Sequence, residues 1–508
     1  MQKIYEILSK IDDKILWGIP MMIVILGSGI FLTVMLRFLQ VRKFGFSLKN
    51  TIGDSVKQMK KKEKKTRDNP NAISPFEAFS TAVSGTVGTG NIVGVTTAII
   101  SGGPGAVFWM WISAFFGMAT KYCEITLGLF FRKKDENGEY IGGPMYYIEN
   151  GLGKKFKWLA TLFAAFTMLA AVGMSSVQAD TIQKTWNSAF RIPTMVTAAI
   201  IAVLTALVVL GGIKRIGKVA SMIVPFMAIL FILFAVVIIL FNVSAIPAAI
   251  GSIFTSAFTA RSMLGGFLGY GIMSAMRYGF ARGIFSNEAG LGSSTIAHST
   301  ATQKEPVKQG MWGIFEVFLD TFVICTLTAL LVLTSGQNTT SPDIVSSTVP
   351  MTAFSNVFGY FGTIVYSVIL PLFAFSTILA WAVYGSKACQ YLFKSATSKF
   401  IFNIIFTVLI VLMAIVTTIG GDNLGSGFVW LISDMTNALM ALPNLIALVA
   451  LGSLTVKITK NYFDRKHGMN IEPMLSAYPE LNRELIDEIK KEEATEETGN
   501  NTEDTIEV

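Results

Sequence analysis

Charged side chains are scarce in this chain. Only 15% of its 508 residues are Asp, Glu, Lys or Arg, whereas a soluble globular protein carries roughly 25%. This scarcity excludes an ordinary soluble domain, and the mean hydropathy of +0.56 points the same way. Apolar residues instead gather in runs long enough to cross a hydrocarbon layer of about 30 Å as helices. The composition therefore predicts an all-α polytopic membrane protein.

Cysteine and histidine are nearly absent. The three cysteines, Cys123, Cys325 and Cys389, lie in apolar segments, so we expect buried thiols and no disulfide framework. The two histidines, His298 and His467, are not spaced with cysteine or carboxylates as metal ligands are, which argues against metal catalysis. The first apolar run also lacks a small-residue cleavage site, so it predicts a transmembrane helix and not a cleaved signal.

The apolar runs predict about eleven transmembrane helices. They fall near residues 17–36, 76–101, 104–131, 157–185, 194–212, 218–241, 267–300, 309–335, 352–393, 399–419 and 425–456. The seventh and ninth are too long for a single crossing. We expect each of these two to include an interfacial extension.

Lys and Arg residues set the expected orientation. They concentrate in segments on one side of the spans, including the loop 37–75, and cytoplasmic loops are enriched in both residues. The sequence thus predicts a multi-pass protein of the cell's inner membrane, with the N-terminus outside and the C-terminus in the cytoplasm. The basic run at 57–68 indicates a topology signal beside anionic lipid and not a nucleic-acid patch.

Three regions follow one another along the chain. Residues 1–75 hold an extracellular segment, the first transmembrane helix and a basic cytoplasmic loop, and residues 76–456 hold a core of ten helices. The last region, 457–508, is expected to be a cytoplasmic tail. Its residues 471–508 contain 12 acidic and 3 basic side chains, which predicts a solvated, disordered segment.

Small and polar residues interrupt the second span. The segment 80–95 reads STAVSGTVGTGNIVGV. Its glycines permit positive φ and close approach, and its threonines and asparagine add oxygen atoms. Small residues can instead serve close helix packing. The interleaved polar groups favour a broken helix, whose backbone dipoles can face an ion and a polar solute at mid-membrane.

A second polar stretch lies in the seventh span. The segment 285–299, FSNEAGLGSSTIAHS, includes Glu288, and a charged residue at the centre of a membrane helix costs at least about 2.5 kcal/mol. We therefore expect a partner or a water-filled cavity around Glu288, together with a second break. A rival break at 265–271 ranks lower because it would leave a half-helix that is too long.

The two breaks divide the predicted helices evenly. When the first span is set aside, the other ten form two groups of five, each opened by a broken helix. Because five is odd, the two groups run in opposite directions through the membrane. This is the inverted repeat of secondary transporters, which bind substrate and coupling ions between the halves.

Several long strings carry a family resemblance. Over about residues 75–450 the chain resembles the alanine or glycine:cation symporters of bacteria and archaea, in VSGTVGTGNIVGV, GGPGAVFWMW, KYCEITLG, GGPMYYIENGLG, RGIFSNEAGLGSS and FAFSTILAWAVYGSK. The resemblance implies a LeuT-type fold, in which one leading helix precedes a 5+5 inverted repeat. It also implies sodium-coupled symport of a small neutral amino acid, namely L-alanine, glycine or D-alanine, by alternating access. Na⁺ is then the coupling ion, and no organic cofactor is expected.

The resemblance also implies a set of site residues. Substrate contacts are expected from Gly85, Thr86, Gly88, Thr89, Gly90, Gln178, Asn287 and Trp381. A sodium site is expected from the carbonyl oxygens of Ser84, Val87 and Phe373 and from the hydroxyl oxygens of Ser376 and Thr377, since hard cations prefer oxygen ligands. Trp381 is expected to cap the cavity and to leave room for no more than a methyl group. For Ser376 and Thr377, a hydrogen bond back to their own helix is the alternative.

Acidic residues in the spans keep one other mechanism open. Glu124, Glu316 and Asp320 lie near membrane depth, and the last two share a helical face. We expect structural pairing with basic side chains. The alternative is a proton-coupled small amino-acid transporter that uses Glu288, Glu316 or Asp320 as a relay.

Other classes of function are disfavoured by what the sequence lacks. An enzyme is not expected, because a paired nucleophile and base, a metal constellation and a phosphate loop are all missing. A channel would need a repeated carbonyl filter or charged rings. The expected partners are therefore a small neutral amino acid and the lipid bilayer, without nucleic acid. The sequence leaves the oligomeric state open.

Overall fold

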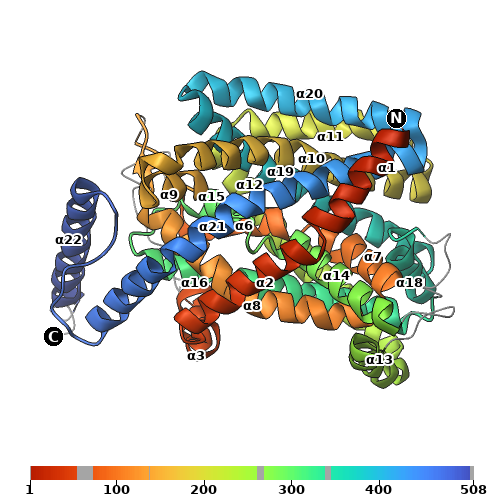
Figure 1. Cartoon of the computed structure of the whole chain (residues 1–508), viewed down its shortest axis with the longest axis horizontal. Helices are drawn as coiled ribbons and strands as arrows, with labels where there is room; N and C mark the ends of the chain where they lie inside the picture. The colour runs from red at the N-terminus through yellow and green to blue at the C-terminus, as the bar shows by residue number, and fades with distance from the viewer. Residues whose placement is uncertain (1, 54–72, 137, 260–267, 338–344, 504–508) are drawn as a thin grey trace.

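The computed structural model of the chain describes residues 2–53, 73–136, 138–259, 268–337 and 345–503, and most of them are helical (Figure 1). The part before the core consists of α1 (Gln2–Ile11), the π-turn η1 (Asp12–Leu16), α2 (Ile19–Met35), α3 (Leu39–Arg42), α4 (Phe44–Leu48) and η2 (Lys49–Gly53). The helix α2 corresponds to the first expected span.

The first half of the core contains five expected spans and one small hairpin. Its helices are α6 (Pro75–Thr86), η3 (Gly90–Gly94), α7 (Val95–Gly102), α8 (Gly105–Phe130), α9 (Pro144–Gly151), η4 (Lys154–Phe156), α10 (Lys157–Phe190), α11 (Thr194–Val209) and α12 (Gly212–Phe241). The strands β1 (Lys133–Lys134) and β2 (Tyr140–Ile141) pair antiparallel between α8 and α9.

The second half begins after a short connection. It consists of η5 (Val243–Ala245), α13 (Ile246–Phe258), α14 (Leu268–Asn287), α15 (Ser293–His298), α16 (Pro306–Val317), η6 (Phe318–Cys325), α17 (Thr326–Thr334), α18 (Thr348–Phe358), α19 (Tyr360–Phe393), α20 (Ala396–Gly420), η7 (Gly421–Ser426) and α21 (Gly427–Lys466). The last helix, α22 (Pro479–Glu503), follows outside the core.

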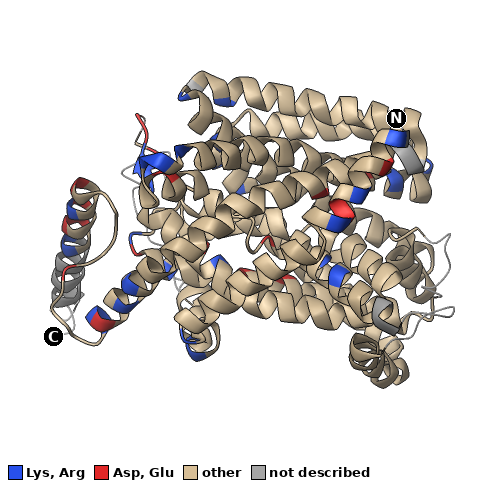
Figure 2. Cartoon of the chain, viewed as in Figure 1, with Lys and Arg blue, Asp and Glu red and all other residues tan. Residues whose placement is uncertain are grey.

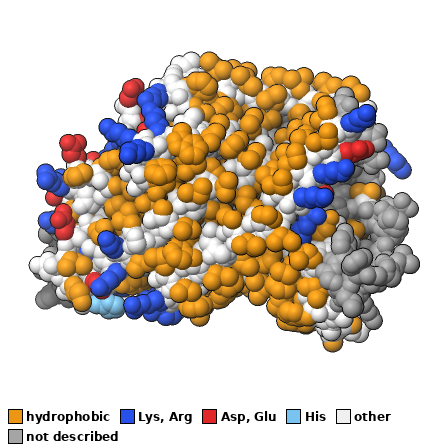
Figure 3. Space-filling model, in the orientation of Figure 1, with side chains coloured by type: hydrophobic (Ala, Val, Ile, Leu, Met, Phe, Trp, Pro, Cys, Tyr) orange, Lys and Arg blue, Asp and Glu red, His pale blue; other side chains and the backbone are white. Residues whose placement is uncertain are grey.

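An apolar belt surrounds the helices. Figure 3 shows hydrophobic side chains over the middle of one face, and charged side chains toward its two ends. Large apolar side chains such as Val203, Phe241 and Ile419 are exposed on α11, α12 and α20. Exposed apolar surface on this scale is typical of contact with lipid. The chain is therefore a multi-pass membrane protein.

The number of membrane crossings depends on how the broken and short helices are counted. Among the described residues, seven helices are long and apolar enough to span a membrane, and the pair of α6 with η3 and α7, bent by 44°, would make an eighth. A helix does lie at each of the eleven expected spans. Several are broken or short, so the count of eleven stays a prediction.

The broken helices lie at the centre of the molecule. The long helices α10 and α19 pack along each other, and α8 packs against α14 and α16. The half-helices α6 and α15 contact each other and α19. Both interruptions are therefore enclosed by protein. At membrane depth, backbone that lacks helical hydrogen bonds needs such shielding from lipid.

Local sequence fixes where α6 begins. The Ser74 hydroxyl accepts a hydrogen bond from the Glu77 amide at 3.2 Å, and the Glu77 carboxylate accepts one from the Ser74 amide at 2.8 Å. Pro75 occupies the first turn. This reciprocal capping box satisfies two amides that a helix start leaves free.

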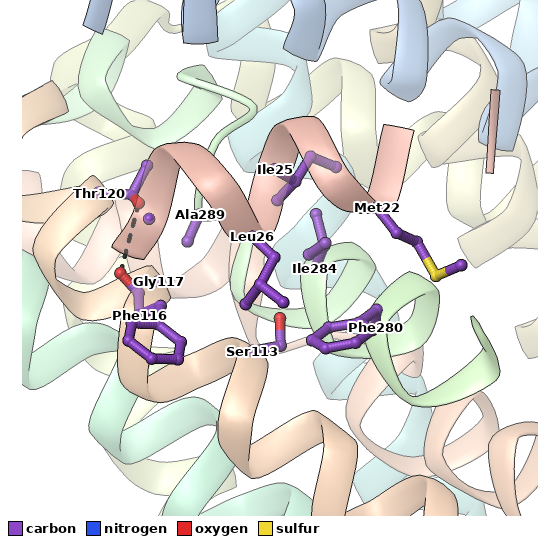
Figure 4. Close-up of a pocket in the computed structure, with 11 residues that line it drawn as sticks. Met22, Ile25, Leu26, Ser113, Phe116, Gly117, Thr120, Phe280, Ile284 and Ala289 are labelled. Carbon is purple, nitrogen blue, oxygen red and sulfur yellow. Dashed lines mark hydrogen bonds between the residues drawn. The ribbon is translucent and has the colours of Figure 1, made fainter. Parts of the chain in front are cut away.

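The leading helix α2 packs closely on α8 at Gly29, and α8 packs closely on the second break at Gly117. A side chain at Gly29 would lie 3.0 Å from Cβ of Phe116 on α8, and one at Gly117 would lie 3.0 Å from Cβ of Ala289 in the second break. Figure 4 shows the crevice left between α2, α8 and α14, with Leu26 and Ala289 on its wall. The crevice holds a cavity of only about 10 Å³, which is the space of a single water molecule.

The acidic tail differs from its prediction. Helix α21 continues to Lys466, and α22 covers residues that were expected to be disordered. Leu475 and Leu485 are buried, and the Ala477 amide donates to the Phe130 carbonyl at 2.8 Å. Two ion pairs neutralise part of the acidic charge, Lys134 with Glu484 at 2.5 Å and Lys304 with Glu488 at 3.2 Å. Complementary charge from neighbouring loops thus orders a segment whose own composition is too polar to fold alone.

Arg132 joins this end of the molecule to the segment after α15. Its buried guanidinium donates to the carbonyls of Ala301 at 2.6 Å and Gln303 at 2.7 Å, and it lies 3.8 Å from the centroid of the Tyr140 ring. Burial lowers the pKa of Arg132 to about 10. The side chain therefore keeps its charge at neutral pH and anchors this segment.

Two other expectations can be placed. The overlong ninth span consists of the separate helices α18 and α19, which meet at Gly359 with φ of 59°. The basic run 57–68 lies outside the described residues, as do residues 265–267 of the rival break. Residues 268–271 belong to α14.

Candidate functional site

The first break follows Thr86. Helix α6 ends there, Val87 leaves the helical conformation with φ of −86° and ψ of 86°, and a π-turn begins at Gly90. The Asn91 side-chain oxygen accepts a hydrogen bond from the Gly88 amide at 2.8 Å, which closes the turn from inside. The backbone between the two half-helices therefore does not follow the hydrogen-bonding pattern of an α-helix.

The glycines of this break are required for clearance. A Cβ at Gly88 would overlap the Thr377 hydroxyl, and a Cβ at Gly85 would lie 2.5 Å from the Tyr384 hydroxyl. Neither glycine has positive φ. The Thr89 amide also donates to Gln178 at 3.1 Å. The break therefore presses directly against α19 and α10.

Oxygen atoms expected to bind sodium lie together on α6 and α19. The Thr377 hydroxyl donates to the carbonyls of Ser84 at 2.8 Å and Phe373 at 3.1 Å, and the Ser376 hydroxyl donates to Phe373 at 2.9 Å. Val87 is the C-cap residue of α6, three residues after Ser84. Both hydroxyls thus make the expected alternative bond within their own helix, and Thr377 also reaches across to the broken helix.

Aromatic residues close the space beside the first break. Trp381 is fully buried, and its ring centroid lies 5.4 Å from that of Tyr384 in an edge-on arrangement. Trp381 Nε1, the Tyr384 hydroxyl and the Thr89 hydroxyl are buried and have no hydrogen-bond partner among the described residues. Because buried polar groups are normally paired, three unpaired ones around one break indicate a place for a polar ligand.

The second break lies where the sequence predicted it. Helix α14 ends at Asn287, and α15 begins at Ser293. Between them Glu288, Gly290 and Gly292 have φ of 54°, 98° and 76°. Here the glycines are required for their backbone conformation, since residues with a Cβ rarely adopt positive φ. Glu288 has the expected partner, because its carboxylate accepts a hydrogen bond from the Ser293 hydroxyl.

Asn287 is engaged within this second break. Its side-chain amide donates to the Thr321 hydroxyl at 3.1 Å, and its oxygen accepts from the Ala289 amide at 3.0 Å. Both ends of the side chain therefore hold the loop. The expected contact of Asn287 with the substrate stays a prediction.

Asp320 connects the two breaks, which the sequence did not reveal. Its carboxylate accepts from the Asn91 side chain of the first break at 2.5 Å and from the Ser286 hydroxyl at 3.0 Å. No ion pair to Asp320 is found among the described residues. Glu316 behaves as expected, since it pairs with Lys121 at 3.2 Å and with His298 at 2.9 Å.

A second unpredicted connection holds Gly290. The Glu124 carboxylate accepts from the Gly290 amide at 2.9 Å and from the Asn444 side chain at 2.6 Å. The same Asn444 amide donates to the Gly290 carbonyl at 2.9 Å. Glu124 of α8 and Asn444 of α21 thus hydrogen-bond to the amide and the carbonyl of one residue in the break.

The three cysteines match their prediction, and one further acidic residue can be placed. Cys123, Cys325 and Cys389 are buried free thiols. Asp180 pairs with Lys184 at 3.3 Å and accepts from Ser426 at 3.0 Å, so it points toward η7.

Comparison with known proteins decides the family. Residues 1–475 match the model described as the sodium:alanine symporter family. The chain belongs to this family. The sodium/alanine symporter AgcS of Methanococcus maripaludis is 39% identical over 455 residues, covering 89% of this chain and 95% of the relative. The probable sodium/glutamine symporter GlnT of Bacillus subtilis is 35% identical over 467 residues, covering 92% of each.

A solved structure supports the fold of this symporter family member. The crystal structure of MhsT in complex with L-phenylalanine matches with a TM-score of 0.52, covering 76% of this chain and 99% of that one, at 13% sequence identity. At this identity the match shows the LeuT-type fold alone. Family and fold together confirm a transporter and not an enzyme, with a leading helix before a core that contains two broken helices.

Proposed function

We propose that the protein imports L-alanine, glycine or D-alanine together with sodium by alternating access. We place it in the inner membrane with its N-terminus outside and its C-terminus in the cytoplasm. The observation that carries the proposal is the hydrogen bond of 2.8 Å from Thr377 to the Ser84 carbonyl. It brings neutral oxygen atoms of α19 against the open end of a broken helix.

The sodium ion would replace this hydrogen bond. Carbonyl oxygens of Ser84, Val87 and Phe373 and the hydroxyls of Ser376 and Thr377 would form an all-oxygen set, which hard cations prefer. The set has no carboxylate, which suits a monovalent ion. Bound sodium would join α6 to α19, and its release would let them separate. Coupling then follows from the ion's greater affinity for the joined arrangement.

The amino acid would lie beside the first break. The backbone around Thr89 and Gly90 would receive its carboxylate, as at other interrupted membrane helices, once the Thr89 amide has left Gln178. The Gln178 oxygen, which now accepts from Thr89, could accept from the substrate's ammonium group. Trp381 would close the side-chain end, because this indole is fully buried next to Tyr384.

The tight packing favours a small substrate. Gly85 and Gly88 have no space for even one added carbon atom. AgcS is named a sodium/alanine symporter, whereas GlnT is named for glutamine. The close approach of Tyr384 to Gly85 supports the former type of substrate for this chain, since a longer side chain would need a wider cavity.

Uptake by the purified protein in liposomes tests the proposal. Radiolabelled L-alanine and glycine should accumulate under an inward sodium gradient without any proton gradient, and L-glutamine should compete poorly. Sodium-independent accumulation of alanine would contradict the coupling ion. Preference for glutamine would contradict the proposed size limit.

Proton coupling remains a second candidate because of Asp320. This carboxylate touches both breaks without an ion pair among the described residues, so its protonation could shift how the half-helices meet. If protons drive transport, Asp320→Asn should abolish accumulation driven by a pH gradient. Under the sodium proposal, wild-type protein shows no such accumulation at all.

A further inference from the structure

A charged cavity lies under the N-terminal helix. It has a volume of about 320 Å³, within the usual range for small-molecule sites. Its walls include Tyr5, Ser9, Asp12, Arg282, Trp430 and Asp434. Figure 2 shows the charged residues of this region near the N-terminus, on a ribbon with few charges elsewhere in its middle.

The cavity offers unsatisfied groups of both signs. Asp12 is only 7% exposed, and its Oδ1 has no hydrogen-bond partner among the described residues. The guanidinium of Arg282 pairs with Asp434 at 3.0 Å, yet its Nε–H is also buried without a partner. A buried charge without its hydrogen bonds is costly. One charged acceptor and one charged donor thus line the same space.

An aromatic layer separates this cavity from the first break. The rings of Trp430 and Phe285 stack with centroids 5.6 Å apart, and the Arg282 guanidinium lies 5.3 Å and 5.5 Å from them. On its other side, Phe285 lies within 3.1 Å of where a Cβ of Gly90 would be. The stacked rings of Trp430 and Phe285 therefore lie between the cavity and Gly90 of the first break.

We propose that this cavity is an outer binding site for the same zwitterionic amino acid, occupied before the aromatic layer opens. Asp12 accepts from the ammonium group, and Arg282 Nε donates to the carboxylate. An α-amino acid carries these two groups on one carbon atom, so it satisfies both unpaired atoms together. The inference rests on the proposed function, since it assumes that amino acids enter from this side.

The charge pattern argues against other small ligands. Among the described residues, no group of three or more acidic, Cys or His side chains could hold a metal ion. A simple anion would be repelled by Asp12 and Asp434, and a simple cation by Arg282 and by Lys184, which also lines the cavity. A molecule with both charges avoids each conflict.

Equilibrium binding of radiolabelled L-alanine to the purified full chain in sodium tests this site. Wild-type protein should bind alanine at a second site beyond the inner one. Asp12→Asn should weaken the outer site at least about tenfold, the effect of losing one hydrogen bond to a charged group, and leave the inner site intact. Asp13→Asn is the matched control, because Asp13 is half exposed, pairs with Arg277 and is not among the residues that line the cavity.

The outcomes separate this inference from the proposed function. Wild-type protein with one alanine site, unchanged by Asp12→Asn, overturns the outer site and leaves the proposed function standing. Wild-type protein that binds no alanine in sodium overturns both.

A labelling experiment detects the outer site without counting sites. Ser9→Cys places a thiol on the cavity wall, and the three native cysteines are buried. In a chain that also carries Gly88→Leu to block the inner site, L-alanine should slow reaction with a small thiol reagent. Propionate and ethylamine, which each carry one of the two charges, should not. If alanine gives no protection in this background, the outer site is refuted even when Asp12→Asn fails to fold.

Discussion

The two broken helices interrupt the membrane in physically different ways. In the first break, Gly85 and Gly88 have ordinary backbone angles, but neighbouring side chains leave no room for a Cβ. In the second, Glu288, Gly290 and Gly292 all have positive φ. We therefore call the first break contact-limited, because neighbouring side chains exclude a Cβ, and the second torsion-limited, because its backbone requires positive φ. A contact-limited break brings its backbone against whatever occupies the site, whereas a torsion-limited break mainly fixes the direction of the chain.

The strongest test of this comparison is Gly88→Leu. We expect alanine uptake to fall to background, because the added side chain would overlap Thr377 at the proposed site. Gly94→Ala is the matched control. Among the described residues, its Cβ would meet Arg282 Cδ alone, at an ordinary distance of 3.9 Å. The measurement is alanine uptake into liposomes by both variants, compared at equal amounts of folded protein. Normal uptake by Gly88→Leu would show that the first break has space for a side chain at this position.

Gly292→Ala should act on stability more than on sodium dependence. The left-handed conformation costs a residue with a Cβ about 1–2 kcal/mol, and here that Cβ would also lie 2.5 Å from Pro144 and 3.0 Å from Asn444. We expect a clearly lower melting temperature of the purified protein. Gly336→Ala carries the backbone cost alone, since no atom of the described residues lies within 4 Å of its Cβ. Equal melting temperatures for the two variants would show that the clash is relieved.

Thr377→Val and Ser376→Ala should differ in their sodium dependence. Only Thr377 reaches the Ser84 carbonyl on the broken helix. Loss of one hydroxyl ligand to an ion should raise the sodium concentration for half-maximal uptake about tenfold. Ser376→Ala should give a smaller shift, because the Ser376 hydroxyl bonds to its own helix and, among the described residues outside that helix, to the Met227 sulfur. A larger effect of Ser376→Ala would place the ion elsewhere.

The smallest expected effect concerns selectivity. Trp381→Leu should weaken alanine uptake about fourfold, since poorer burial of one methyl group costs about 0.8 kcal/mol. The enlarged cavity should also admit serine or valine. Trp158→Leu is the control, because this tryptophan is 60% exposed. Competition by larger amino acids is the measurement, and an unchanged ranking of substrates would make Trp381 a packing residue.

The features of the fold that depend on neighbouring residues in the sequence could be predicted. Glycines among polar residues predicted both breaks, although the reason for the glycines at the first one proved to be Tyr384 and Thr377. The contacts of Asp320 could not be predicted from the sequence. Its partner Asn91 lies 229 residues away, and pairing across that distance depends on packing that no local pattern records. The order of the tail could not be predicted for the same reason, since its acidic composition does not indicate which basic residues it will contact.

The contact between the tail and the hairpin region also sets an order of assembly. The Tyr478 hydroxyl donates to the Phe131 carbonyl, a residue 347 positions earlier in the chain. Synthesis proceeds at about 5–20 residues per second, so roughly 20–70 s pass between the two residues. During that time the end of α8 has no tail to cover it. The final shape of this edge is therefore completed only after the last membrane helix has been made.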